Sequence, residues 1–174
     1  MATHSKVVKV VPYDPSWQEA FANIRDMIQS YIGDLIVRIE HVGSTSVPGL
    51  SAKPVIDLDV VIESNDLLSE IVERLAKQGY QHQGNLGIEG REAFQRTVDD
   101  DHMTYHLYVC PQDSRELRRH ILFRDYLRKH PEARDGYQAL KVDLAEKYRY
   151  DIDTYCEMKT DFITGILVKA KQEE

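Results

Sequence analysis

The 174-residue chain lacks several features that would assign it to a class at once. It has two cysteines, Cys110 and Cys156, which are too few for a disulfide framework, and neither belongs to a motif that marks a catalytic thiol. No apolar run approaches the ~20 residues that a membrane-spanning helix needs, and the first residues contain no signal-type apolar segment. We therefore expect a cytoplasmic protein with no membrane partner.

Positive charge is also scarce. The 22 Lys and Arg residues are outnumbered by 29 Asp and Glu residues, so the net charge is −7. Broad binding to nucleic acid depends on basic patches that neutralise phosphates, so we expect no nucleic-acid partner, although a local site for a small nucleotide stays possible. Linkers, repeats and low-complexity segments are absent as well. The length and the 42% hydrophobic content fit one domain over residues 1–174.

The phosphate-binding Walker A loop is missing, because the residue after Gly49 is Leu50 where that motif requires Lys. A Gly-Ser turn, Gly43-Ser-Thr-Ser46, instead follows a short apolar strand predicted at residues 37–42. Glycine tolerates unusual dihedral angles and lets backbone amides approach an anion, while the hydroxyl groups add further donors. The turn is a candidate phosphate cradle, and an ordinary turn is the alternative.

Two carboxylates lie on the next predicted strand. Residues 55–62 are apolar and mostly β-branched except at Asp57 and Asp59. Side chains alternate between faces with a rise of ~3.3 Å per residue, so both carboxylates project from one face about 7 Å apart. Buried charges are usually paired or bound to metal. The pair predicts a shared Mg²⁺ or Mn²⁺ ion, and an edge strand with solvated carboxylates is the alternative.

With this turn and this strand, the chain resembles the nucleotidyltransferase superfamily, in which Gly-Ser in a short helical turn precedes two acidic residues on the next strand. More closely, it resembles the GrpB family over roughly residues 7–168. The matching stretches are His41-Val-Gly-Ser-Thr-Ser-Val-Pro-Gly-Leu-Ser-Ala-Lys-Pro-Val-Ile-Asp-Leu-Asp59, His106-Leu-Tyr-Val109, Phe123-Arg-Asp-Tyr-Leu-Arg-Lys-His-Pro131 and the spaced Tyr137, Leu140, Lys141, Tyr155 and Lys159.

The resemblance implies a nucleotidyltransferase-like fold and metal-dependent transfer of a nucleoside monophosphate from a nucleoside triphosphate to a small acceptor. GrpB-like domains also occur fused to dephospho-CoA kinase, which points to nucleotide or coenzyme A metabolism. The alternative is a non-catalytic module that binds a nucleotide or a coenzyme A related ligand. An acidic interaction domain without a ligand is a third possibility. The sequence leaves the oligomeric state open.

Many active nucleotidyltransferases carry a third carboxylate on a neighbouring strand, but here the strand predicted at residues 102–110 carries His106. Alternation allows His106 to face the two aspartates if that side of the strand lines the cleft. It would then bind the metal or act as a general base. A sheet histidine bonded to a neighbour is the alternative. Glu92 and the triplet Asp99–Asp101 compete for the role of third acid, although the triplet is typical of a solvated turn.

A triphosphate and two aspartates together bring about six negative charges, so cations beyond one metal ion are needed. Lys53, Arg124 and Lys141 are the favoured sources, and Arg124 and Lys141 belong to the GrpB pattern. The candidate phosphate-binding residues are Gly43, Ser44, Ser46, Lys53, Arg124 and Lys141, and the candidate catalytic residues are Asp57, Asp59 and His106, of which the two aspartates hold the metal.

Hydrophobic periodicity predicts an α/β (α+β) domain with a mixed sheet of about five strands, packed helices and a C-terminal helical layer. Strands are expected at 7–11, 37–42, 55–62, 80–82, 91–98 and 102–110, the last two forming a hairpin. Helices are expected at 15–32, 64–77, 114–129, 133–148 and 153–171.

Overall fold

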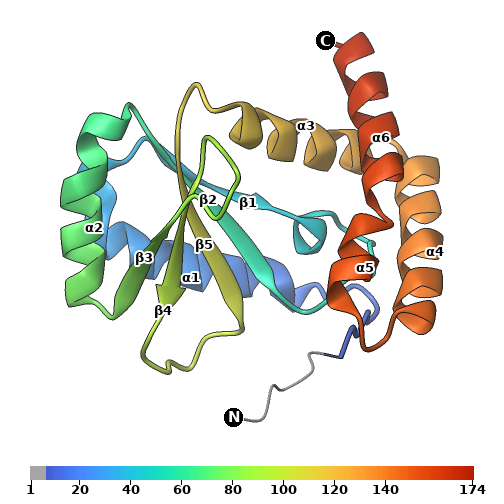
Figure 1. Ribbon diagram of the computed structural model, residues 1–174, viewed down its shortest axis with the longest axis horizontal. Coiled ribbons are helices and arrows are strands. Elements are labelled where there is room, and N and C mark those ends of the chain that lie inside the picture. The colour runs from blue at the N-terminus through green and yellow to red at the C-terminus, as the bar shows by residue number, and fades with distance from the viewer. Residues whose placement is uncertain (1–6) are drawn as a thin grey trace.

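The computed structural model describes residues 7–174, in which five strands form one mixed sheet (Figure 1). The order across the sheet is β1-β2-β5-β4-β3, and β2 and β5 run parallel whereas the other neighbours are antiparallel. This confirms the predicted mixed sheet, including the hairpin of β4 and β5. The strands are β1 (Arg38–Val42), β2 (Ile56–Ile62), β3 (Tyr80–Gly84), β4 (Glu92–Arg96) and β5 (Tyr105–Pro111).

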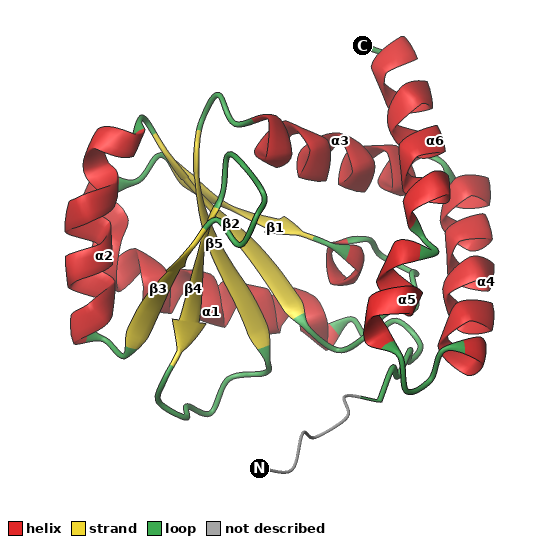
Figure 2. Ribbon diagram, viewed as in Figure 1, coloured by secondary structure: helices red, strands yellow, loops and turns green. Residues whose placement is uncertain are grey.

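Helices cover the sheet and extend beyond one end of it (Figure 2). The helices α1 and α2 pack together against strands β2 and β3, α3 contacts β1, and α4 to α6 form the expected C-terminal layer. None of the helices within residues 7–174 has the length and apolarity needed to cross a bilayer. The helices are α1 (Ser16–Ile32), α2 (Leu68–Lys77), α3 (Arg115–Lys129), α4 (Pro131–Lys147), α5 (Ile152–Glu157) and α6 (Thr160–Gln172), with short 3₁₀ turns η1 (Gly33–Leu35), η2 (Ser44–Ser46) and η3 (Asn65–Leu67).

The alternation of side chains along β2 decides which of its residues face the candidate site. Leu58 belongs to the main core, which α1 and α2 also build, whereas Val61 packs with Leu117 of α3 on the opposite side. Asp57 and Asp59 have the same parity as Val61, so both carboxylates lie on the α3 side of the sheet. The prediction that the two aspartates share a face is therefore confirmed, and that face is only partly covered by α3.

The first predicted strand is wrong. Residues 7–11 pair with the rest of the protein as a strand only at Val11, which forms an isolated bridge with Ala52. Val8 instead packs beneath the C-terminal layer with Leu144 and Tyr155. The apolar residues of this segment thus bury themselves against helices, and Pro12 lacks the amide that would continue a ladder.

The last predicted helix, residues 153–171, is also wrong as a single element, because it is broken after α5. The two pieces pack against different neighbours. Tyr155 of α5 contacts the cluster around Leu144, whereas Ile166 of α6 packs with Tyr126 of α3. The turn between them changes the direction of the chain, which a hydrophobic period read along one axis does not register. Helix α4 begins at Pro131, two residues earlier than predicted, since proline is favoured in a first helical turn.

Candidate functional site

A cavity of about 340 Å³ lies where the Gly-Ser turn, the start of β2 and the helices α3 to α6 meet. It collects side chains that are far apart in the sequence, and two thirds of the predicted site residues line it. From the predicted set these are Gly43, Ser44, Lys53, Asp57, His106 and Lys141; the wall is completed by Thr45, Val55, Arg119, His120, Phe123, Tyr137, Tyr155, Lys159 and Ile163.

The Gly-Ser turn lies directly against the first carboxylate of β2. Gly43 has a φ of +74°, a conformation that side-chain-bearing residues rarely adopt. A Cβ atom built on it would also overlap Oδ2 of Asp57. Glycine is therefore required both by the backbone and by the contact, and the turn brings its backbone to the wall of the cavity beside Asp57.

Asp57 and His106 form a pair on neighbouring parallel strands. The register of β2 and β5 sets Asp57 opposite His106, and Nδ1 of the ring lies 3.0 Å from Oδ1 of the carboxylate. The side chains are 29% and 53% exposed, so both can contact a ligand in the cavity. The placement of His106 beside the acidic strand, predicted from alternation, agrees with this geometry.

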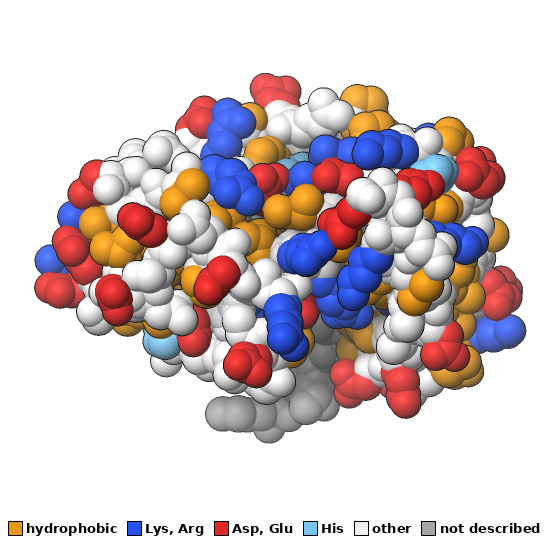
Figure 3. All heavy atoms as spheres, turned by 90° about the horizontal axis from the view of Figure 1, so that it is seen from above, with side chains coloured by type: hydrophobic (Ala, Val, Ile, Leu, Met, Phe, Trp, Pro, Cys, Tyr) orange, Lys and Arg blue, Asp and Glu red, His pale blue; other side chains and the backbone are white. Residues whose placement is uncertain are grey.

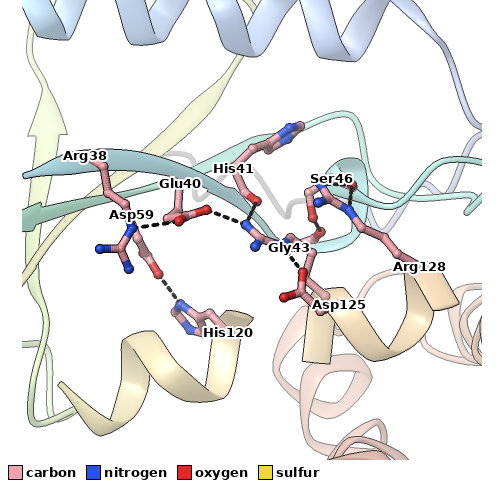
Figure 4. A network of polar contacts seen from close by, with 10 residues as sticks. Arg38, Glu40, His41, Gly43, Ser46, Asp59, His120, Asp125 and Arg128 are labelled. Atoms are coloured by element: carbon pink, nitrogen blue, oxygen red, sulfur yellow. Dashed lines mark hydrogen bonds and ion pairs between the residues drawn. The ribbon is translucent and has the colours of Figure 1, made fainter. Parts of the chain in front are cut away.

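Asp59 has a different environment (Figure 4). Its side chain is fully buried, and Oδ2 lies 2.6 Å from Nδ1 of His120 on α3. The other ring nitrogen of His120 lies 3.0 Å from Glu116. Burial alone would lower the pKa of His120, but hydrogen bonds to the two carboxylates outweigh it and raise the pKa to about 9. His120 is thus an imidazolium at neutral pH that neutralises Asp59.

Sequence reasoning missed His120. The only local signal is the spacing of Glu116 and His120, which places them one turn apart on the same face of a helix. Such a pair usually marks a solvated helix surface. Its significance comes from the contact with Asp59, 61 residues away in the chain.

The two aspartates have different partners, and their shared metal site stays a prediction. Oδ2 of Asp59 contacts His120, and Oδ1 is buried without a hydrogen-bond partner. Within residues 7–174, no three or more His, Cys, Asp and Glu side chains are grouped to hold a metal ion. Asp57 and His106 still offer one oxygen and one nitrogen donor at the cavity. That pair fits a divalent ion that takes most of its ligands from phosphate oxygens and water, as Mg²⁺ commonly does.

Three lysines reach the cavity from three different segments. Lys53 precedes β2, Lys141 lies on α4, and Lys159 lies between α5 and α6. In the described part of the chain, none of them has a carboxylate within ion-pair distance, unlike Lys77 and Lys147. Lys141 is only 2% exposed, and burial, together with the neighbouring Lys159 and Lys53, lowers its pKa to about 6. The cavity therefore brings together basic side chains that have no counter-ion among the described residues.

Ser46 and Arg124, both expected to bind phosphate, lie outside the lining of the cavity. The Ser46 hydroxyl donates to the carbonyl of Gly43, and the Ser46 carbonyl accepts two hydrogen bonds from Arg128 (Figure 4). Arg124 is nearly buried and donates to Glu40 of β1 at 2.7 Å. In this geometry both residues hold the turn and β1 against α3, and a contact of either with phosphate stays a prediction.

His41 provides a second support for the turn. Its ring stacks on Phe21 of α1, with the ring centroids 4.5 Å apart. Its Nε2 lies 3.0 Å from Oγ1 of Thr45, which donates in turn to the carbonyl of Val55. Burial lowers the pKa of His41 to about 4, so the ring is neutral. The stretch that resembles the GrpB family begins at His41, but the sequence assigned this residue no role.

Solved structures of distant proteins share this architecture. The Cid1 poly(U) polymerase bound to MgATP aligns with a TM-score of 0.57 at 10% identity, covering 80% of this chain and 44% of that one. Cid1 in complex with the UTP analogue UMPNPP aligns with a TM-score of 0.54, also at 10% identity, covering 80% of this chain and 42% of that one. At such identities the likeness concerns the fold alone. It shows that this chain shares its fold with these polymerase structures.

Closer relatives identify the family. The GrpB protein of Enterococcus faecalis superposes with a TM-score of 0.84 at 32% identity, covering 95% of this chain and 98% of that one. The glutamate-rich protein GrpB of Alkalihalophilus pseudofirmus is 34% identical over 92% of this chain and 94% of its own length. YqkA of Bacillus subtilis is 34% identical over 95% of this chain, which spans about half (48%) of YqkA. A dephospho-CoA kinase of Mycobacterium tuberculosis is 30% identical over 87% of this chain and 43% of its own length. The family model described as GrpB protein matches residues 7–169, and the chain therefore belongs to the GrpB family.

Proposed function

We propose that the cavity binds a nucleoside triphosphate together with Mg²⁺ or Mn²⁺, and that the protein transfers the nucleoside monophosphate to a small acceptor. One observation carries the proposal. The Gly43 turn, the Asp57–His106 pair and the lysines Lys53 and Lys141 line a single cavity. A donor pair for a divalent ion thus lies beside cations without counter-ions, which is the charge pattern that a metal-bound polyphosphate would complement.

Each group has a role in this proposal. The Gly43 turn and the Ser44 hydroxyl contact phosphate oxygens, and Lys53 and Lys141 balance their charge. Asp57, assisted by His106, would hold the divalent ion, which would neutralise charge that develops on the phosphates. Asp59 is the second candidate ligand of that ion, because its Oδ2 contacts His120 whereas its Oδ1 has no hydrogen-bond partner among the described residues.

The proposed reaction forms a bond between the acceptor oxygen and the α-phosphorus and breaks the bond from the α-phosphorus to the bridging oxygen. Pyrophosphate leaves with that electron pair. A general base must take the proton of the acceptor hydroxyl, and His106, half-exposed in the cavity wall, is the candidate. A ligand role for the same ring is the alternative, because its Nδ1 already lies beside Asp57.

A second candidate function is a module that binds a nucleotide or a coenzyme A related ligand without turnover. The pairing of Asp59 with His120 favours it, since the imidazolium already neutralises one of the two carboxylates that the transfer reaction would use to hold the metal ion. The cation-rich cavity fits this function equally well. The two functions differ in whether pyrophosphate is released.

Calorimetry and a turnover assay test both functions. Mg²⁺ should increase the affinity for a nucleoside triphosphate in the wild-type protein, and Asp57→Asn should abolish that increase. Asp161→Asn, an exposed carboxylate on α6, is the control and should behave as wild type. Adding Asp59→Asn tests whether the second aspartate contributes. Binding that is identical in wild type and in the Asp57→Asn Asp59→Asn double variant would refute the metal assignment.

Turnover is measured as pyrophosphate release across a panel of nucleoside triphosphates and small hydroxyl-bearing acceptors. His106→Ala should remove most of the release and keep much of the binding. Metal-dependent binding without release from any combination would favour the non-catalytic module.

A further inference from the structure

Lys53, Lys141 and Lys159 form a lysine cluster at the cavity, and no structural role explains why three amines lie so close together. Lys53 and Lys159 place their ammonium groups 5.5 Å and 4.4 Å from the centre of the same ring, that of Tyr155. Lys141 lies 5.0 Å from the centre of the Tyr137 ring. The two rings thus form a floor for three amines that no described carboxylate pairs with. The rings stabilise cations only partly, at about 0.5–2 kcal/mol for each contact.

Tyr155 adds an unused donor to this cluster. Its side chain is fully buried among residues that line the cavity, and its hydroxyl has no hydrogen-bond partner within the described chain. Burial raises the pKa of Tyr155 to about 12, so the hydroxyl keeps its proton and remains a donor. Leaving such a group unpaired costs about 1–3 kcal/mol. A ligand atom that accepts a hydrogen bond would remove this cost.

The Lys141 amine carries less than a full positive charge. Burial and the two neighbouring lysines lower its pKa to about 6, so the amine is mostly neutral at pH 8. None of the described carboxylates lies within ion-pair distance of Lys141, and Asp57, which contacts His106, is the one carboxylate among the described residues that line the cavity. The charged or titratable groups that line the cavity with Lys141 are Lys53, Lys159, Tyr137, Tyr155, Asp57, His106, Arg119 and His120.

We propose that Lys53, Lys141, Lys159 and Tyr155 form a subsite for a di- or triphosphate chain, and that this polyanion binds together with one proton taken up by the Lys141 amine. The nucleotide class of the ligand rests on the proposed function, whereas the subsite itself does not. A chain with three or more negative charges reverses the repulsion that keeps Lys141 neutral, so the amine accepts a proton and becomes a donor to phosphate oxygens. A single phosphate brings too little charge to do so. The subsite therefore selects polyphosphate over monophosphate ligands.

The test uses inorganic tripolyphosphate, which has no nucleoside and cannot be a nucleotidyl donor. Calorimetry at pH 8 in buffers of different ionisation enthalpy counts the protons taken up on binding. Wild type should take up about one proton more per bound ligand than Lys141→Arg, whose side chain is always charged. Lys169→Met, which removes an exposed lysine of α6, should match the wild type.

A second measurement avoids dependence on one substitution. The affinity of wild type relative to Lys141→Arg should fall as pH rises from 7 to 9, by up to about tenfold per pH unit. Tyr155→Phe should weaken tripolyphosphate binding several-fold without changing the proton count. Inorganic phosphate should bind much more weakly than tripolyphosphate to the wild-type protein.

Equal proton counts in wild type and Lys141→Arg, or equal affinity for phosphate and tripolyphosphate, would overturn the inference. Different outcomes would refute the proposed function and the subsite. Proton-linked tripolyphosphate binding with no Mg²⁺-dependent nucleotide binding would refute that function and leave the subsite intact. Metal-dependent nucleotide transfer without a proton difference would refute the subsite alone.

Discussion

Gly43 is restrained by its neighbour as well as by its backbone, and a matched glycine separates the two effects. Gly87 also has a positive φ, +82°, but an added Cβ would meet nothing within 4 Å. Gly87→Ala should therefore cost about 1–2 kcal/mol, the strain of a left-handed residue with a side chain. Gly43→Ala should cost more, because the Asp57 carboxylate must also move. Urea denaturation measures both costs.

The same pair of variants addresses binding. Gly43→Ala should lose nucleotide affinity by at least about tenfold, since a displaced Asp57 costs on the order of 1.4 kcal/mol or more in binding. Gly87→Ala should bind as wild type. If Gly43→Ala keeps full affinity in calorimetry, the turn is not part of the binding site.

His120 should matter for stability more than any other histidine of the site, because it neutralises a fully buried carboxylate. His120→Ala leaves Asp59 without its cation, and breaking a buried pair costs about 3–5 kcal/mol. Arg118→Ala, on the same helix with a 63% exposed side chain, should change stability by about 0.5 kcal/mol or less. A double-mutant cycle with Asp59→Asn should give a large coupling energy. A coupling near zero would show that the two residues stabilise the fold independently.

At the scale of the residue, alternation along a strand predicts that Asp57 and Asp59 share a face and allows His106 to join them, and the register of β2 and β5 places all three on one side of the sheet. It could not show that the two aspartates have different partners, because His120 comes from a helix whose position depends on packing. Arg124 and Lys141 looked equivalent in the family pattern for the same reason. Arg124 donates a hydrogen bond to Glu40 of β1, whereas Lys141 lines the cavity.

At the scale of the element, helix α3 holds the Gly-Ser turn from behind. Arg128 donates to the Ser46 carbonyl through both Nε and Nη2, at 3.0 and 2.8 Å, and does not line the cavity. Arg128→Ala should weaken nucleotide binding by a few fold and speed hydrogen exchange of the amides in residues 43–47, because the turn loses about 1–3 kcal/mol of charge-assisted hydrogen bonding.

Arg134→Ala is the control for that change. Arg134 reaches the neighbouring carbonyl of Pro48 from α4 with a longer contact, 3.3 Å, on the exposed surface. Arg134→Ala should therefore affect hydrogen exchange of the turn amides much less than Arg128→Ala does. Unchanged exchange in Arg128→Ala would mean that Ser46 and His41 fix the turn without help from α3.

The order and type of most elements followed from hydrophobic period and from turn residues, and the exceptions have a common cause. The segment 7–11 and the break between α5 and α6 are both decided by packing around Tyr155, a contact between the two ends of the described chain. Local patterns do not contain that contact. This stretch also carries Tyr155 and Lys159, which line the cavity, so the least predictable stretch contributes directly to the candidate site.

At the scale of the whole molecule, net charge is a poor guide to this cavity. The chain carries a charge of −7, yet Lys and Arg side chains gather around the middle of the face over α3 and the end of α6, with acidic side chains among and around them (Figure 3). Among the described residues, three lysines and one carboxylate line the cavity. Composition gives the charge of the whole chain and does not report this local excess of basic side chains.

That local excess should appear in the pH dependence of unfolding. The pKa of Lys141 falls from 10.5 to about 6 on folding, so between these values the unfolded chain binds more protons than the native protein. The contribution of Lys141 to the free energy of unfolding therefore rises with pH across this window and is most unfavourable at or below pH 6. Lys141→Met removes it and should stabilise the ligand-free protein, on the order of several kcal/mol at pH 6 and progressively less toward pH 9. Thermal unfolding at pH 6, 7.5 and 9 measures the trend, with Lys169→Met as the exposed control, whose effect should not decline in this way. A gain in stability from Lys141→Met that is constant from pH 6 to 9 would mean that the buried amine keeps an ordinary pKa. Lys141 would then be fully charged in the ligand-free protein.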